Sequence, residues 1–152
     1  MYDTILVPTD GSEVAELAVD HALDLAEKYD ATVHTIYVVD TDSMDLSLGA
    51  EQVDRIESGQ FGDMEELGEK AEAATNRVAS RGEQQNISIV EHVGAGKPHL
   101  VITNYADDND IDLIVMGSHG RGGVRRMLLG SVAERVLRTS RRPVMVVDSR
   151  EE

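Results

Sequence analysis

The chain has 152 residues, no cysteine and a formal net charge of −15 at pH 7. This length fits one domain, residues 1–152, which buries about two-thirds of its unfolded surface and folds without disulfides or a structural metal. The absence of cysteine excludes thiolate metal sites and cysteine nucleophiles, and it is typical of the cytoplasmic protein that we expect. The acidity argues against nucleic-acid and membrane-surface binding, and we find neither a signal peptide nor the ~20 apolar residues of a membrane span.

Basic residues are concentrated near the C-terminus. Residues 117–142 contain seven arginines and one acidic residue, a net charge of +6, whereas residues 1–116 contain six basic and 25 acidic residues. The chain also has three lysines against eleven arginines, a composition that resembles proteins of salt-loving microbes. We therefore expect a halophile and stabilisation by molar salt, with an ordinary acidic bacterial protein as the alternative.

Hydrophobic periodicity predicts alternating strands and helices. Short apolar runs rich in β-branched residues predict strands at residues 4–7, 32–39, 87–93, 111–116 and 144–147. Apolar residues at helical spacing predict a first helix through Ala15, Ala18, Ala22, Leu25, Ala26 and Tyr29, and a second through Phe61, Met64, Leu67, Ala71, Ala74 and Val78.

Two shorter helices are predicted in the second half of the chain. Pro98 is a favourable first residue for one of them. The last helix is expected to begin at Ser131, because Ser131 and Glu134 have the spacing of a capping box. It is expected to turn Val132, Val136 and Leu137 inward.

This alternation indicates an α/β fold, a doubly wound and mostly parallel sheet of five strands with helices on both faces. Ligands of such sheets bind beyond the carboxyl ends of the strands, where the strand order reverses. The loops after the first and fourth strands, residues 8–12 and 116–120, are therefore the expected binding loops.

Asp10 follows the first strand, where a carboxylate can accept hydrogen bonds from both hydroxyls of a ribose. The alternative is that Asp10 caps the first helix, a role that Ser12 could also fill. Val38 and Val39 end the second strand and could contact an adenine ring, although core packing is the stronger interpretation from the sequence alone.

The sequence Gly117-Ser118-His119-Gly120, followed after nine residues by Gly130-Ser131, lies between a predicted buried strand and a predicted helix. Glycine permits a close backbone approach or a positive φ, and a helix N-terminus offers unpaired N–H groups to phosphates. Arg121 could neutralise phosphate charge or simply face solvent. The alternative for the glycines is a flexible turn followed by a capped helix.

Four other kinds of site are excluded by their sequence patterns. Residues 94–97 resemble part of a Walker A loop, but Pro98 stands where Ser or Thr would hold Mg²⁺. The glycines near residue 120 do not match GxGxxG, and the histidines lack zinc spacing. No GxSxG elbow is present, which leaves His119 as the one histidine of interest.

The chain resembles the universal stress protein family, whose nucleotide-binding members carry Gly-x2-Gly-x9-Gly-Ser/Thr. That pattern is complete at Gly117, Gly120, Gly130 and Ser131. The segments ILVPTDGSE, YVVD, DLIVMGSHGRGG, LLGSVAERVL and RRPVMVVD resemble the family in order and spacing across nearly the whole chain.

The resemblance implies a Rossmann-like sheet of order 3-2-1-4-5, bound ATP or AMP/ADP with Mg²⁺ or Mn²⁺, and a homodimer joined through the last strand. It places Pro8, Thr9 and Asp10 at the adenosine end, with Val38 on the adenine. It places Met116, Gly117, Ser118, Gly120 and Arg121 along the ribose and phosphates, with Gly130, Ser131 and Val132 on the phosphates.

The function expected from these residues is regulatory. Nucleotide occupancy would order residues 119–129 and change the surface shown to a protein partner. No general base for fast hydrolysis is evident, so any ATPase activity should be slow. The alternatives are a hydrolase or phosphotransferase that uses His119 or an acidic residue of the segment 41–59, and a dimeric interaction module that binds no nucleotide.

Overall fold

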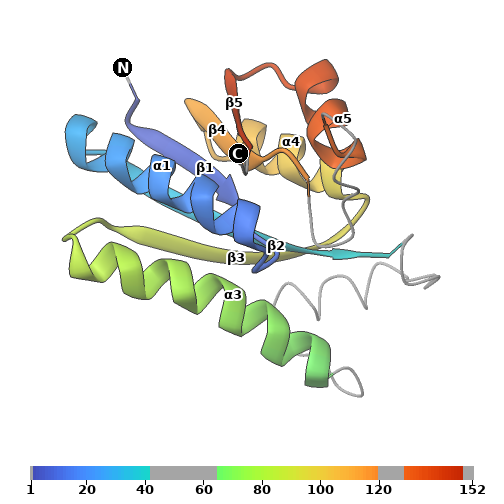
Figure 1. Cartoon of the computed structure of the whole chain (residues 1–152). Coiled ribbons are helices and arrows are strands. Elements are labelled where there is room, and N and C mark those ends of the chain that lie inside the picture. The colour runs from blue at the N-terminus through green and yellow to red at the C-terminus, as the bar shows by residue number, and fades with distance from the viewer. Residues whose placement is uncertain (1, 42–64, 120–128, 149–152) are drawn as a thin grey trace.

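A computed structural model of the chain describes residues 2–41, 65–119 and 129–148. The described strands form one parallel five-stranded sheet with the order β3-β2-β1-β4-β5 (Figure 1). The elements are β1 (Thr4–Pro8), α1 (Glu13–Tyr29), β2 (Thr32–Asp40), α3 (Glu65–Gln84), β3 (Ile89–Gly96), α4 (Pro98–Asp108), β4 (Leu113–Gly117), α5 (Ser131–Thr139) and β5 (Val144–Val147). The predicted fold class and strand order are confirmed.

Helices cover both faces of the sheet, with α1 and α3 on one face and α4 and α5 on the other (Figure 1). Successive residues of β1 therefore serve different cores. Ile5 and Val7 pack with α1, whereas Leu6 packs with α4 and α5. This two-sided burial explains why the strands are continuous apolar runs instead of alternating ones.

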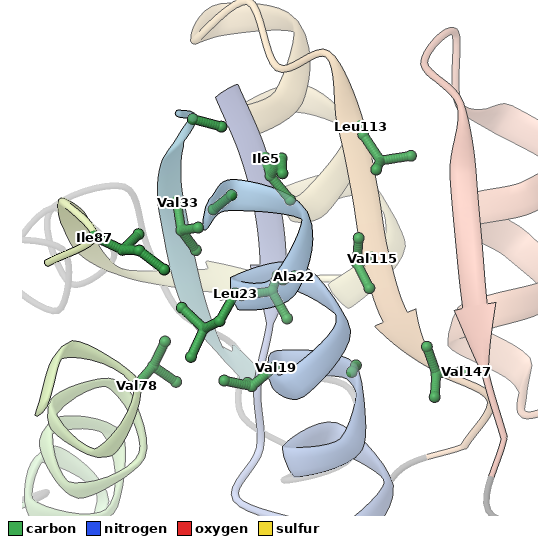
Figure 2. Close-up of a cluster of buried hydrophobic side chains, with 14 residues drawn as sticks. Ile5, Val19, Ala22, Leu23, Val33, Val78, Ile87, Leu113, Val115 and Val147 are labelled. Carbon is green, nitrogen blue, oxygen red and sulfur yellow. The ribbon is translucent and has the colours of Figure 1, made fainter. Parts of the chain in front are cut away.

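The buried strand residues of the core under α1 and α3 come from β1, β2, β4 and β5 (Figure 2), and the partly buried Ile89 of β3 packs against them. Val19 and Leu23 of α1 lie fully buried between the sheet and Val78 of α3. The predicted alanine face of α1 is buried as expected, and its small side chains let the helix lie close to β1 and β4. Tyr29, which the periodicity also placed on this face, is 42% exposed.

Details of β3 and α5 differ from the prediction. Strand β3 begins at Ile89 and runs through Gly94 to Gly96, so most of the predicted turn before Pro98 is strand. Helix α5 does begin at Ser131, but Gly130 is its N-cap and no side chain caps it, so the predicted capping box is wrong. Leu137 is 42% exposed instead of inward. Phe61 and Met64 lie outside the described residues.

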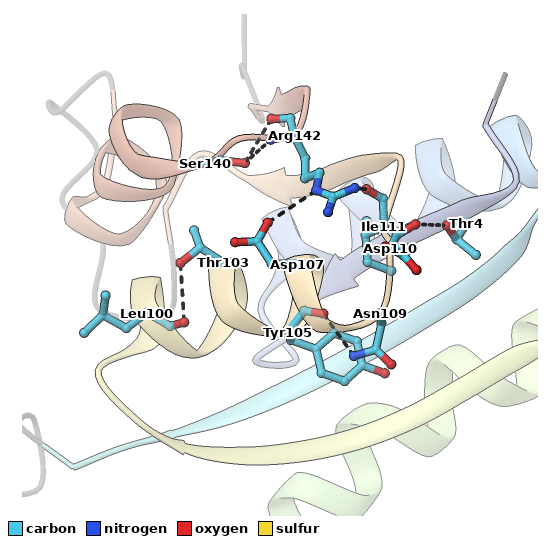
Figure 3. A network of polar contacts seen from close by, with 10 residues as sticks. All are labelled: Thr4, Leu100, Thr103, Tyr105, Asp107, Asn109, Asp110, Ile111, Ser140 and Arg142. Carbon is cyan, nitrogen blue, oxygen red and sulfur yellow. Dashed lines mark hydrogen bonds and ion pairs between the residues drawn. The ribbon is translucent and has the colours of Figure 1, made fainter.

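A polar network lies at the edge of the sheet opposite the loops that follow β1 and β4 (Figure 3). Arg142, which precedes β5, donates to the carbonyl oxygen of Ile111 at 3.0 Å and lies 3.4 Å from the Asp107 carboxylate of α4. Asp112 accepts the backbone N–H groups of Asp3 and Thr4 at 2.9 and 3.0 Å. These contacts fix the starts of β1, β4 and β5, and leave the carboxyl ends for the candidate site.

Candidate functional site

The candidate site is the edge of the sheet where β1 and β4, which are neighbours, both end. The chain builds β2 and β3 on one side of β1, then crosses through α4 to build β4 and β5 on the other. The strand order thus reverses between β1 and β4, as the sequence predicted. Loops at such a point diverge and leave room for a ligand between them.

The loop after β1 is held by its own side chains. The Thr9 N–H donates to the carbonyl oxygen of Ile36 at 2.9 Å, and the Thr9 hydroxyl accepts the Gly11 N–H at 3.2 Å. Gly11 has φ of 79°, a conformation that favours glycine. The Asp10 carboxylate accepts the Ser12 N–H at 2.9 Å, while the Ser12 hydroxyl caps α1 by accepting the Ala15 N–H. The capping role is therefore filled by Ser12, and Asp10 is held in the turn.

Gly117 ends β4 directly against the first turn of α1. A Cβ at this position would lie 2.9 Å from Cγ1 of Val14 and 3.2 Å from its backbone carbon and oxygen. The positive-φ glycines among the described residues are Gly11 and Gly96, so Gly117 does not need glycine for its φ. Packing against Val14 therefore disfavours a side chain at this position even without any ligand.

Ser118 joins three segments of the site. Its N–H donates to the carbonyl oxygen of Val147 at 2.8 Å, its carbonyl oxygen accepts the Gly130 N–H, and its hydroxyl donates to the Asp148 carboxylate at 2.7 Å. Only 1% of the residue is exposed. The N–H, carbonyl and hydroxyl groups of Ser118 are therefore all hydrogen-bonded inside the protein. The residue has a structural role, and its buried hydroxyl is not accessible as a nucleophile.

Gly130 brings the N-terminus of α5 against the loop after β4. A Cβ on Gly130 would lie 3.0 Å from Cα of His119 and 3.1 Å from the carbonyl oxygen of Ser118. The Gly130 N–H is used by Ser118, but the N–H groups of Ser131, Val132 and Ala133 precede the first intrahelical bond, from Glu134 to Gly130. These three amides have no partner among the described residues. Their arrangement suits an anion.

Three of the apolar residues assigned to the site, Val38, Met116 and Val132, belong to the core under α4 and α5. Met116 is 5% exposed and packs in that core, and Val38 is half-buried against it. Gly120 and Arg121 lie outside the described residues. The structure thus brings Gly117, Ser118 and Gly130 together, with Pro8 ending the neighbouring strand.

Acidic side chains neutralise part of the positive charge of residues 117–142. Among the described arginines of this segment, Arg138 pairs with Glu134 at 3.0 Å and Arg142 with Asp107, while Arg135 and Arg141 are exposed. The described residues contain no group of three or more His, Cys, Asp or Glu side chains placed to hold a metal ion.

Asp148 is a site residue that the sequence reasoning missed. It follows β5 and reaches Ser118 from a position 30 residues away in the chain. Its sequence signal is the one that identified Asp10, a carboxylate directly after a buried strand.

No helix in the part of the chain that the structure describes is long and apolar enough to cross a membrane.

The chain is similar to known proteins over nearly its whole length. A model of the universal stress protein family matches residues 1–148. Universal stress protein MJ0531 of Methanocaldococcus jannaschii is 39% identical over 147 residues, which cover 97% of this chain and 82% of that protein. The solved structure of MJ0577 from the same organism has a TM-score of 0.80 at 30% identity, covering 100% of this chain and 99% of that one. A universal stress protein in complex with cAMP has a TM-score of 0.67 at 26% identity, covering 96% of this chain and 97% of that one.

Proposed function

Because the chain belongs to the universal stress protein family, we propose that it binds an adenine nucleotide, ATP in the first place, between the loops after β1 and β4. The observation that carries the proposal is the N-terminus of α5. Its first-turn amides lack a side-chain cap, and Gly130 fixes them beside the loop after β4. The complex of a related protein with cAMP supports an adenine nucleotide as the ligand class.

The proposed contacts follow from the chemical group that each residue offers to the ligand. Asp10, held in its turn, accepts the ribose hydroxyls, and Val38 borders the adenine. The amides of Ser131 and Val132 receive the phosphates at the positive end of the α5 dipole. In the same proposal Pro8, Thr9, Met116, Gly117, Ser118 and Gly130 shape the site, while Gly120 and Arg121 complete the phosphate contacts and Mg²⁺ or Mn²⁺ accompanies the phosphates.

Calorimetric titration with ATP tests this site through Asp10→Asn. The amide oxygen can still accept the Ser12 N–H, but loss of the charged acceptor should weaken ATP affinity about tenfold or more. Removing a negative charge would otherwise favour an anionic ligand, so weaker binding identifies a direct contact. Asp24→Asn on the exposed side of α1 is the matched control. Equal affinity of Asp10→Asn and wild type would reject the ribose assignment.

We propose that nucleotide binding serves regulation through a nucleotide-dependent conformational change, not rapid turnover. Such a change requires that the bound and free conformations differ in nucleotide affinity. Hydrogen exchange with and without ATP should show new protection in the loops after β1 and β4. A steady-state turnover that His119→Ala abolishes while ATP binding persists would instead favour the hydrolase.

We also propose a homodimer joined through the edge of β5. Among the described strands β5 pairs with β4 on one side only, and Met145 on β5 is 37% exposed. Unpaired edges with apolar residues tend to find a partner strand. In light scattering, Met145→Lys should shift the dimer toward monomer, whereas Leu100→Lys, at a 44% exposed residue of α4, should not. A wild-type monomer at micromolar concentration would reject the dimer.

The proposed setting is the cytoplasm of a salt-loving organism. A cysteine-free chain suits a reducing compartment, and a charge of −15 with few lysines suits high salt. A salt titration of stability tests the second part.

A further inference from the structure

Three side chains at the end of β4 and β5 form a continuous chain of hydrogen bonds. The Ser118 hydroxyl lies 2.7 Å from Oδ1 of Asp148 and 3.1 Å from Nδ1 of His119. Ser118 is almost completely buried, whereas His119 is half-buried and Asp148 exposed. The buried hydroxyl thus connects a carboxylate from one strand end with an imidazole from the other.

The number of protons available to these three hydrogen-bonded side chains determines the tautomer of the imidazole. An ionised carboxylate only accepts hydrogen bonds, so the single Ser118 proton goes to Asp148. Oγ of Ser118 can then only accept from the ring of His119, which must carry a proton on Nδ1. In a neutral ring this leaves Nε2 unprotonated, the opposite of the form that predominates for free histidine in water.

The position of His119 relates this constraint to the proposed nucleotide site. Its Cα and Cβ lie against Gly130, at 3.0 and 3.3 Å from the place of a Cβ on that glycine. Gly130 is in turn the N-cap of α5, whose first-turn amides are the proposed phosphate contacts. Nε2 lies outside the hydrogen-bond chain and has no partner among the described residues.

We propose that Asp148 is a positioning residue which, through the Ser118 hydroxyl, fixes the tautomer and orientation of His119 and so reserves Nε2 for the bound nucleotide or its water. Only the contact of Nε2 with a bound nucleotide or its water rests on the proposed function. The control of the His119 tautomer by Asp148 is expected in the protein without nucleotide as well.

Nitrogen-15 NMR of the nucleotide-free protein tests the tautomer directly. With labelled histidine, at a pH where the rings are neutral, the wild-type His119 signals should show a protonated Nδ1, and His119→Gln identifies them among the five histidines. Asp148→Ala and Ser118→Ala should both shift His119 toward the Nε2-protonated form. Asp24→Ala removes an exposed carboxylate of α1 and should leave His119 unchanged. A wild-type ring protonated on Nε2, or an unchanged tautomer in Asp148→Ala, would overturn the proposal.

ATP titration of the same variants tests the consequence, and two mechanisms predict opposite signs. If Asp148 acted only through its charge, Asp148→Ala would bind the anionic nucleotide more tightly. Positioning predicts that Asp148→Ala weakens ATP affinity about three- to tenfold, the range expected for one misplaced hydrogen bond, while Asp24→Ala binds as wild type. Tighter or equal binding by Asp148→Ala would refute the functional part. If the wild type itself binds no ATP, the proposed function fails, and the NMR result still decides the role of Asp148.

Discussion

Gly117→Ala should destabilise the protein in the absence of any nucleotide. The new Cβ would lie 2.9 Å from Cγ1 of Val14 and 3.2 Å from two backbone atoms of that residue. The first contact can relax by a small movement of a side chain, but the backbone contacts require a shift of α1. Overpacking of this kind costs about 1–3 kcal/mol.

A smaller effect opposes this cost. Gly117 is not among the described glycines with positive φ, so alanine can adopt its backbone conformation. Alanine then stabilises by about 0.4–1 kcal/mol, because the unfolded chain has fewer conformations to lose. The expected net loss is about 1–2 kcal/mol, which for a domain of this size lowers Tm by about 2–8 °C.

Urea unfolding of the nucleotide-free protein measures this loss, and a double-mutant cycle with Val14→Ala identifies its cause. In the Val14→Ala background the contact with Cγ1 is gone, so Gly117→Ala should destabilise less than it does in the wild type. If Gly117 were glycine only for a ligand, Gly117→Ala would leave the nucleotide-free stability equal or higher. That result would refute the packing explanation.

Three further predictions concern stability. Arg142→Ala removes the bonds to Ile111 and Asp107 and should lower the free energy of unfolding by about 1 kcal/mol, whereas an unchanged urea midpoint would show that these bonds contribute nothing. Burial lowers the pKa of His34, and the charge of His92 lowers it further. As the pH falls below about 6.5, the unfolded chain therefore binds a proton at His34 before the folded protein does. The free energy of unfolding should decrease until the pH reaches the lowered pKa of the folded state, and this decrease should be smaller in His34→Gln. Equal pH slopes for the two proteins would contradict this. Molar KCl should raise Tm, because it screens repulsion among the excess acidic residues, and a flat titration would count against a halophilic protein.

The periodicity of the sequence was sufficient to predict the order of strands and helices, and with it the edge of the sheet where the candidate site lies. Hydrophobic spacing follows from the geometry of a single helix or strand, so Ala18 and Ala22 were placed correctly in the core. The same rule failed for Leu137 and Tyr29, which lie near helix ends where the core no longer covers them. At Ser131 the local capping signal was overridden, because Gly130 is fixed as the N-cap by its bond to Ser118.

The sequence by itself therefore determined the α/β architecture and the glycine-rich loops, because both depend on neighbours a few residues apart. Only the tertiary structure showed which contacts constrain the residues of these loops. Gly117 is restricted by Val14, and Ser118 is occupied by Asp148, partners that the folding of the sheet brings together from distant parts of the chain. The space around a Cβ and the partner of a buried hydroxyl are set by segments that meet only in the folded protein, and no local pattern records them.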